Sequence, residues 1–203
     1  MVRKTRKIKD KWKEKKWITV MAPESFNNIP VAYIPITNDK TAVGRVVEVT
    51  LFDILKGDPS QHQYKIFFQI NKLSGEKATT IFKRYEYSKE FLRSLIRRGS
   101  SRINFSIDAK TKDGHMFRIK ILTLSHRELN TSRKRALRLE AKKQIEKIVP
   151  HMTIDEFAQA ACYGKISSDI MATTKKIIRV RHVGLEKVKL LRTSEEEIAL
   201  LQA

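Results

Sequence analysis

The chain has 203 residues, of which 42 are Lys or Arg and 22 are Asp or Glu, giving a formal net charge of +20. Hydrophobic residues make up 41%, which supports a folded core and excludes a disordered polycation. The single cysteine, Cys162, excludes an internal disulfide and fits a reducing cytoplasm. No apolar run reaches the roughly 18–20 residues of a membrane span, and the basic start lacks the apolar core of a signal peptide.

The first sixteen residues are predicted to form a basic arm. Only Asp10 and Glu14 oppose its Lys and Arg side chains, a charge density that suits a polyanion. Two tryptophans at its end offer flat rings for stacking on nucleotides. Trp17 borders the first predicted strand, so a core position is its alternative role. The residues of this segment expected to bind RNA are Lys4, Arg6, Lys7, Lys11, Trp12, Lys13, Lys15, Lys16 and Trp17.

Residues 17–124 are predicted to form a β-rich core domain. A short extended piece at 17–21 precedes a stretch that its prolines keep non-helical through about residue 41. Alternation of apolar and polar residues then predicts a series of strands. Their expected positions are 47–51, 64–70, 77–85, 103–107 and 117–121. Five or six antiparallel strands with one apolar face would form a curled antiparallel sheet or a small β-barrel.

Two local signals refine this domain. Ser88 is a suitable N-cap for a short helix at 89–98, whose inner face would carry Phe91, Leu92 and Leu95. Between the last two strands, Asp113-Gly114 predicts a tight hairpin turn in which both residues have positive φ.

Residues 125–192 are predicted to be a helical region that ends in a basic strand, followed by an acidic tail at 193–203. The apolar stripe of a helix at 131–149 comprises Leu137, Ala141, Ile145 and Ile148. Thr153-x-x-Glu156 is a capping box for a second helix, which Gly164 ends. A third helix is expected at 168–176 and the basic strand at 177–191. The predicted fold class is therefore α+β.

Basic clusters recur along the whole chain, with few acids to pair them, and predict several RNA contacts rather than one. Ser100 and Ser101 lie beside arginines, where their hydroxyls would suit phosphate oxygens. DNA is the less favoured ligand because no helix-turn-helix or zinc-finger pattern appears. The further candidate RNA-binding residues are Arg45, Arg93, Arg97, Arg98, Arg102, Arg118, Lys120, Arg133, Lys134, Arg135, Arg179, Arg181, Lys187 and Lys189.

Signals for catalysis are weak. The sequence has no phosphate-cradling glycine motif, its histidines are scattered, and Cys162 falls on the apolar side of a predicted helix. Carboxylates at strand ends and turns leave a nuclease-like metal site as the alternative, on Asp53, Asp58, Asp108 and Asp113. We therefore predict no catalytic residue, no metal and no cofactor.

Several blocks, in order along nearly the whole chain, carry a family resemblance. They are Lys9–Trp17 followed by Ala22-Pro23, Gly44–Val49, Arg93–Arg98 with Ser101–Ile103, Thr111–Gly114 with Arg118, and Gly164–Ile166. In these blocks the chain resembles the S3Ae family of archaeal and eukaryotic small-subunit ribosomal proteins, in its shorter archaeal form.

The resemblance implies a structural protein of the cytoplasmic ribosome, on the small-subunit platform near the messenger exit. Its partners would be ribosomal RNA and neighbouring small-subunit proteins, with messenger RNA near the exit as a further candidate, and no membrane. No catalysis or cofactor is implied. The alternatives are an RNA-processing nuclease and a factor that visits the ribosome transiently during assembly or translation.

Overall fold

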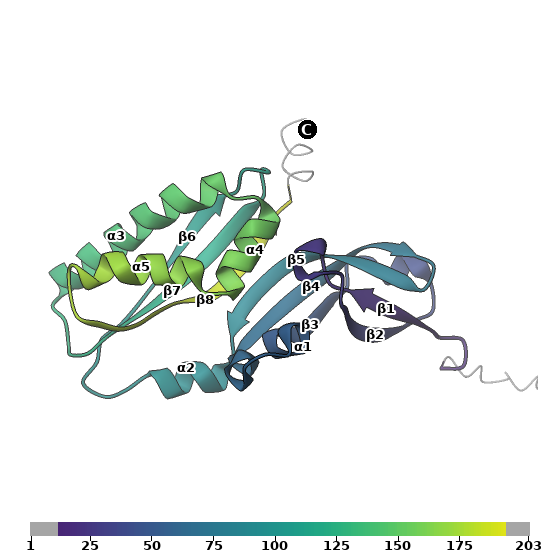
Figure 1. The fold of residues 1–203 in the computed structure, drawn as a ribbon, viewed down its shortest axis with the longest axis horizontal. Helices are drawn as coiled ribbons and strands as arrows, with labels where there is room; N and C mark the ends of the chain where they lie inside the picture. The colour runs from purple at the N-terminus through teal and green to yellow at the C-terminus, as the bar shows by residue number, and fades with distance from the viewer. Residues whose placement is uncertain (1–11, 194–203) are drawn as a thin grey trace, which may run out of the picture.

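A computed structural model describes residues 12–193, so most of the predicted arm and all but the first residue of the predicted tail lie outside the described range. The described chain is α+β, as predicted, and combines eight strands with five α-helices (Figure 1). The strands are β1 (Lys16–Met21), β2 (Pro30–Ile36), β3 (Val46–Thr50), β4 (Tyr64–Ser74), β5 (Lys77–Tyr87), β6 (Arg102–Lys110), β7 (Met116–Ser125) and β8 (Val180–Arg192). The helices are α1 (Leu51–Leu55), α2 (Lys89–Leu95), α3 (Thr131–Ile148), α4 (Ile154–Cys162) and α5 (Lys165–Lys175).

All eight strands belong to one open, mixed sheet. Its main path runs β2-β1-β5-β8-β7-β6, and β3 and β4 extend from β5 as a branch. Most pairs are antiparallel, but β1 pairs with β5 in parallel, with Thr19 opposite Lys77. The curled sheet therefore does not close into a barrel. It is mixed because β1 runs parallel to the first residues of β5.

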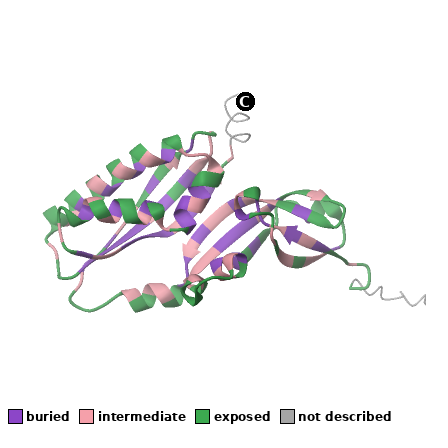
Figure 2. Ribbon diagram, in the orientation of Figure 1, coloured by how far each residue is buried: buried purple, intermediate pink, exposed green. Residues whose placement is uncertain are grey.

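Strand β5 connects the two halves of the molecule. Its first residues pair with β1, its whole length pairs with β4, and its last residues, Arg84–Glu86, pair with β8. Helices α3, α4 and α5 lie over one face of the β6-β7-β8 half (Figure 1). Buried residues follow the central strands, whereas the outward side of α3 is exposed (Figure 2).

The apolar alternation places the core as predicted along most strands. Phe117, Ile119 and Ile121 of β7 are fully buried and belong to the same apolar cluster as Ala141 and Ile145 of α3. The opposite side of β7 carries Arg118 and Lys120 in its first half, because successive strand residues point to opposite faces, and the buried Leu122 and Leu124 in its second half. One face of this half-sheet is thus covered by helices, and part of the other face carries charge.

The strand predicted at 47–51 ends one residue early. Leu51 is the first residue of α1, a short helix that the alternating pattern concealed. The physical reason is a capping box, in which the Thr50 side chain accepts the Asp53 N–H and the Asp53 carboxylate accepts the Thr50 N–H at 3.1 Å. The Asp53 carboxylate is therefore used in the cap that begins α1 directly after β3.

The hairpin β6–β7 is confirmed, but its turn differs from the prediction. Five residues, 111–115, connect the strands, and only Gly114 has positive φ, at +85°. Asp113 does not adopt the left-handed conformation. Its carboxylate instead accepts the Ile154 N–H at 2.7 Å, at the start of α4. A tertiary hydrogen bond to α4 therefore takes the place of the expected two-residue turn.

The helical predictions are largely confirmed. Ser88 caps α2 through the Phe91 N–H, although α2 ends at Leu95 because Ile96 is extended. Thr153 and Glu156 form the predicted capping box of α4. The third helix begins earlier than predicted, directly after Gly164, and β8 begins at Val180 rather than at residue 177.

Candidate nucleic-acid interface

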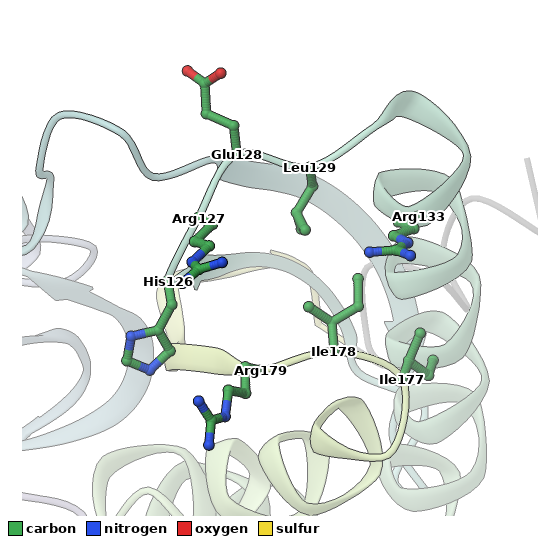
Figure 3. A pocket seen from close by; sticks show the side chains of 8 residues that line it. All are labelled: His126, Arg127, Glu128, Leu129, Arg133, Ile177, Ile178 and Arg179. Carbon is green, nitrogen blue, oxygen red and sulfur yellow. The ribbon is translucent and has the colours of Figure 1, made fainter.

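A basic hollow of about 860 Å³ opens where β7, α3 and the start of β8 meet (Figure 3). It combines two segments that are distant in sequence, one leading from β7 into α3 and one leading from α5 into β8. The residues that line the hollow are His126, Arg127, Glu128, Leu129, Arg133, Ile177, Ile178 and Arg179.

The charge of this hollow is strongly positive. Arg127, Arg133 and Arg179 line it from different sides, and the carboxylate of Glu128 points away from the opening (Figure 3). Sequence reasoning had selected Arg133 and Arg179, but it had missed Arg127. Three guanidinium groups around one concave surface are suited to phosphate oxygens, because each can donate two parallel hydrogen bonds.

The N-terminus of α3 adds to this positive field. The N-cap Asn130 makes no side-chain capping bond, and the first turn holds no acidic residue. It holds Arg133 instead, and Lys134 and Arg135 follow directly. Cations at this end of a helix oppose the helix dipole, which favours anions there. The arrangement is unfavourable in the absence of an anion, and a phosphate at this end of the helix would offset it.

Two buried serines fix the segment on one side of the hollow. Ser101 is 7% exposed, and its hydroxyl accepts the Leu129 N–H at 3.0 Å. The Ser125 hydroxyl donates to the Arg127 carbonyl and accepts the Ser101 N–H. The Ser100 hydroxyl donates to the Arg97 carbonyl at 2.7 Å. Ser100 and Ser101 therefore bond to the protein backbone in this structure, and their expected role at phosphate stays a prediction.

A second basic surface lies on the side of the half-sheet that α3, α4 and α5 leave uncovered, and we call it the charged sheet face. Paired residues across four strands form two rows on this side. One row is Asp108, Arg118, Lys189 and Arg84, and the other brings Lys120 and Lys187 next to Glu86. The charged residues of the face are Arg84, Glu86, Arg102, Asp108, Arg118, Lys120, Glu186, Lys187 and Lys189.

Glu186 organises the centre of this face. The register between β7 and β8 shifts at this point, since Lys120 pairs with Lys187 and Ile121 pairs with Leu185. The bulge turns Glu186 toward the charged side. Its carboxylate accepts hydrogen bonds from Lys120 at 2.8 Å, from Asn104 and from Arg102. Only 8% of Glu186 is exposed, so three donors satisfy a nearly buried carboxylate.

Other cations of the charged sheet face also have acidic partners, which sequence reasoning had not foreseen. Arg118 forms a double hydrogen bond with Asp108, at 2.7 and 2.8 Å. Those bonds lower the pKa of the Asp108 carboxyl and raise the pKa of Arg118. Lys187 pairs with Glu86 at 3.1 Å. The face therefore presents an excess of positive charge on an ordered lattice of ion pairs.

Arginines around α2 divide into two roles. Arg93, Arg97 and Arg98 are exposed at and beyond the C-terminal end of the helix. Positive charges there interact favourably with the negative end of the helix dipole. Arg181 of β8 is half-buried and donates to the Leu95 carbonyl. Arg181 thus ties the end of α2 to the sheet, while the other three remain accessible.

Four of the predicted N-terminal residues lie outside the described part of the chain: Lys4, Arg6, Lys7 and Lys11. Trp12 and Trp17 are 59% and 57% exposed, so the alternative that Trp17 belongs to the core is wrong. Lys13 and Lys16 are exposed, and Lys15 lies over the Trp12 ring, 4.2 Å from its centroid. Arg45 donates to the Pro35 carbonyl at 3.2 Å and remains exposed.

Most of the residues considered for catalysis are engaged in hydrogen bonds within the protein or are buried in its core. Asp53, Asp108 and Asp113 each accept hydrogen bonds described above. Cys162 is buried in α4, which raises the pKa of its thiol. Within residues 12–193 no three His, Cys, Asp or Glu side chains gather as a metal site. In the same range, no helix combines the length and apolarity needed to cross a membrane.

Comparison with known proteins identifies the family. The model of the ribosomal S3Ae family matches residues 3–194. The chain belongs to the ribosomal S3Ae family. It is 42% identical over 184 residues to the small ribosomal subunit protein eS1 of Desulfurococcus amylolyticus, which covers 91% of this chain and 86% of that protein.

Two further S3Ae relatives are similar over comparable lengths. The eS1 protein of Saccharolobus islandicus is 39% identical, covering 93% of this chain and 90% of its own. That of Ignicoccus hospitalis is 41% identical, covering 91% and 87%. These relatives are archaeal, as the sequence blocks suggested. Membership of the S3Ae family gives the chain a structural ribosomal role and not an enzymatic one.

Proposed function

We propose that this chain binds ribosomal RNA of the small subunit and holds it through several separate basic surfaces. The surfaces are the hollow, the charged sheet face, the arginines around α2, and the N-terminal arm at residues 1–16. Neighbouring small-subunit proteins are its other partners in the cytoplasmic ribosome. Its archaeal relatives are small ribosomal subunit proteins eS1, which supports the assignment to the small subunit.

The observation that carries the proposal is the uncapped, acid-free N-terminus of α3 beside the hollow. It places Arg133 on the same hollow as Arg127, which precedes the helix in the same segment, and Arg179, which comes from the segment leading into β8. Like charges held together in this way repel each other in the isolated protein. A phosphate backbone relieves the repulsion, and its bound counterions are released to solvent. The geometry therefore favours a polyanion over a neutral protein surface.

We also propose a position on the platform of the small subunit, near the messenger exit, with messenger RNA as a candidate partner there. Support for this position comes from the resemblance of the sequence blocks to the family. Sedimentation of cell extract in high salt tests the structural role. A constituent stays with the small subunit, and a protein that washes off is a transient factor instead.

RNA binding through the hollow is tested with the double variant Arg133→Gln/Arg179→Gln. The matched control is Lys40→Gln/Lys65→Gln, which removes the same charge elsewhere; Lys65 already pairs with Glu48 at 2.7 Å. Affinity for small-subunit ribosomal RNA is measured across a salt series. The hollow variant should lose roughly 0.7–0.9 in log–log slope for each phosphate contact removed. Equal slopes for the two variants would exclude the hollow as a phosphate site.

The arm is tested by deleting residues 1–11, which leaves every described residue in place. The deletion should weaken RNA binding and flatten its salt dependence, while the free energy of unfolding stays unchanged. RNA binding at full strength after the deletion would show that the arm is not one of the contact surfaces.

A further inference from the structure

The hairpin β1–β2 carries exposed aromatic rings on one face at the edge of the sheet. Trp17 pairs with Pro35 and Thr19 pairs with Tyr33, so these four side chains share a face. The opposite face carries the buried Ile18, and Figure 1 shows β2 as the outermost strand of this half. The outer face is therefore available to a ligand, while the inner face anchors the hairpin in the core.

Exposure of these rings is high. Tyr33 is 69% exposed, more than Trp17 or Trp12, although an aromatic ring contributes most to stability when it is buried. The register defines the spacing. Trp17 and Tyr33 are diagonal neighbours on adjacent antiparallel strands, and Cα atoms in this relation are about 7–8 Å apart. Two rings in this relation can each receive one of two successive unpaired bases, as aromatic residues of RNA-binding sheets do.

The surroundings of the rings are arranged for a charged, flat ligand. Trp12 meets Trp17 in an edge-to-face contact, with ring centroids 6.2 Å apart and an interplanar angle of 84°. Lys15 covers Trp12. Lys77 of β5 lies beside Thr19 in the parallel pair and is exposed. Cations therefore flank the rings at two sides, where the phosphates of a stacked strand would run.

We propose that Trp17 and Tyr33, supported by Trp12, form a stacking platform for unpaired bases of RNA. This inference deepens the proposed RNA binding and rests on it. The rings select single-stranded RNA because a duplex keeps its bases stacked inside and offers them no face. Lys15 and Lys77 supply the attraction for the backbone. Tyr33 is the new member of the site, and charge patterns alone gave no sign of it.

The two tryptophans give a direct signal, because Trp12 and Trp17 are the only ones in the chain. Binding of a single-stranded oligouridylate should quench their fluorescence, and a duplex RNA of equal length should quench it far less. Total binding is measured in parallel by anisotropy of labelled RNA. The full-length protein is used throughout.

The variant Tyr33→Ala should weaken oligouridylate binding roughly 5- to 150-fold, the range for loss of one stacked base. Tyr33→Phe keeps the ring and should bind like the wild type. Tyr33 is exposed, so neither change should alter the unfolding transition.

Three results would overturn the platform. Oligouridylate that binds without quenching, or equally to Tyr33→Ala, leaves RNA binding standing but removes stacking. Duplex RNA that quenches as strongly refutes the preference for unpaired bases. Variants that disturb particle assembly while quenching is unchanged would identify a protein contact. Failure of any RNA to bind at low salt would instead reject the proposed function itself.

Discussion

Substitution Glu186→Gln separates the stability of the charged sheet face from its affinity for RNA. The change keeps the shape of the side chain and removes the charge that Lys120 and Arg102 share. The amide oxygen of glutamine can still accept a hydrogen bond from Lys120 or Arg102. Its NH2 group, however, would face the side chains that donate to Glu186 in the wild type. Lys120 and Arg102 then surround a nearly buried neutral side chain and have no negative charge there to balance theirs.

The magnitude follows from burial. Only 10% of the Glu186 side chain is exposed, against 39% for Lys120 and 40% for Arg102. Breaking a fully buried pair costs about 3–5 kcal/mol, and exposed pairs contribute about 0.2–1 kcal/mol. Because the cations keep part of their hydration, we expect a loss of about 2 kcal/mol. For a chain of this size that lowers the Tm by about 4–8 °C.

Urea unfolding at low ionic strength measures the effect. The matched control is Glu48→Gln, which makes the same substitution in a pair as short as 2.7 Å but with half of the glutamate side chain exposed. This control should cost less than about 1 kcal/mol. A double variant, Glu186→Gln with Lys120→Met, should cost less than the sum of its parts, because it removes one of the uncompensated cations.

RNA affinity should move in the opposite direction. Glu186→Gln makes the face more positive by one charge, so binding to RNA at low salt should strengthen while the fold weakens. Equal destabilisation by Glu186→Gln and Glu48→Gln would refute the importance of burial. Unchanged or weaker RNA binding by a folded Glu186→Gln variant would exclude this face from the interface.

Three further outcomes are expected. Asp108→Asn should make the free energy of unfolding less dependent on pH in the acid range. The hydrogen bond from Arg118 lowers the pKa of Asp108 in the folded state. The wild type therefore has this stabilisation above the unfolded-state pKa of about 3.9 and loses it as the pH falls through the folded-state pKa. Cys162 should resist a thiol reagent at pH 8 until urea unfolds the protein, since its thiol is buried; rapid native labelling would contradict this. Gly184→Ala should destabilise by about 1–3 kcal/mol, because the new Cβ overlaps the Tyr87 hydroxyl, and Tyr87→Phe should relieve part of that loss, as thermal unfolding would show.

Local signals in the sequence were sufficient wherever one segment decides its own structure. The capping box at Thr153 and the cap at Ser88 appear as predicted, because caps depend on residues three positions apart. Local reasoning was wrong where a distant group competed. Asp113 was assigned to a tight turn, yet it bonds to the start of α4, 41 residues away.

The candidate interface shows the same division. Sequence reasoning located Arg133 and Arg179 as cations, but it could not bring them to one hollow or add Arg127 from a third position. It also missed Tyr33, because a single tyrosine in a proline-rich stretch carries no charge pattern. Its exposure became visible only when β1 and β2 were paired.

The sequence by itself determined the α+β class, the positions of most elements, the excess of positive charge and the family. Those properties depend on composition, periodicity and residue order, which are local or additive. Only the tertiary structure decided which cations are accessible and which are held by Glu186, Asp108 and Glu86. That distinction depends on strand register and on one bulge in β8, where a shift of a single residue turns a side chain to the opposite face.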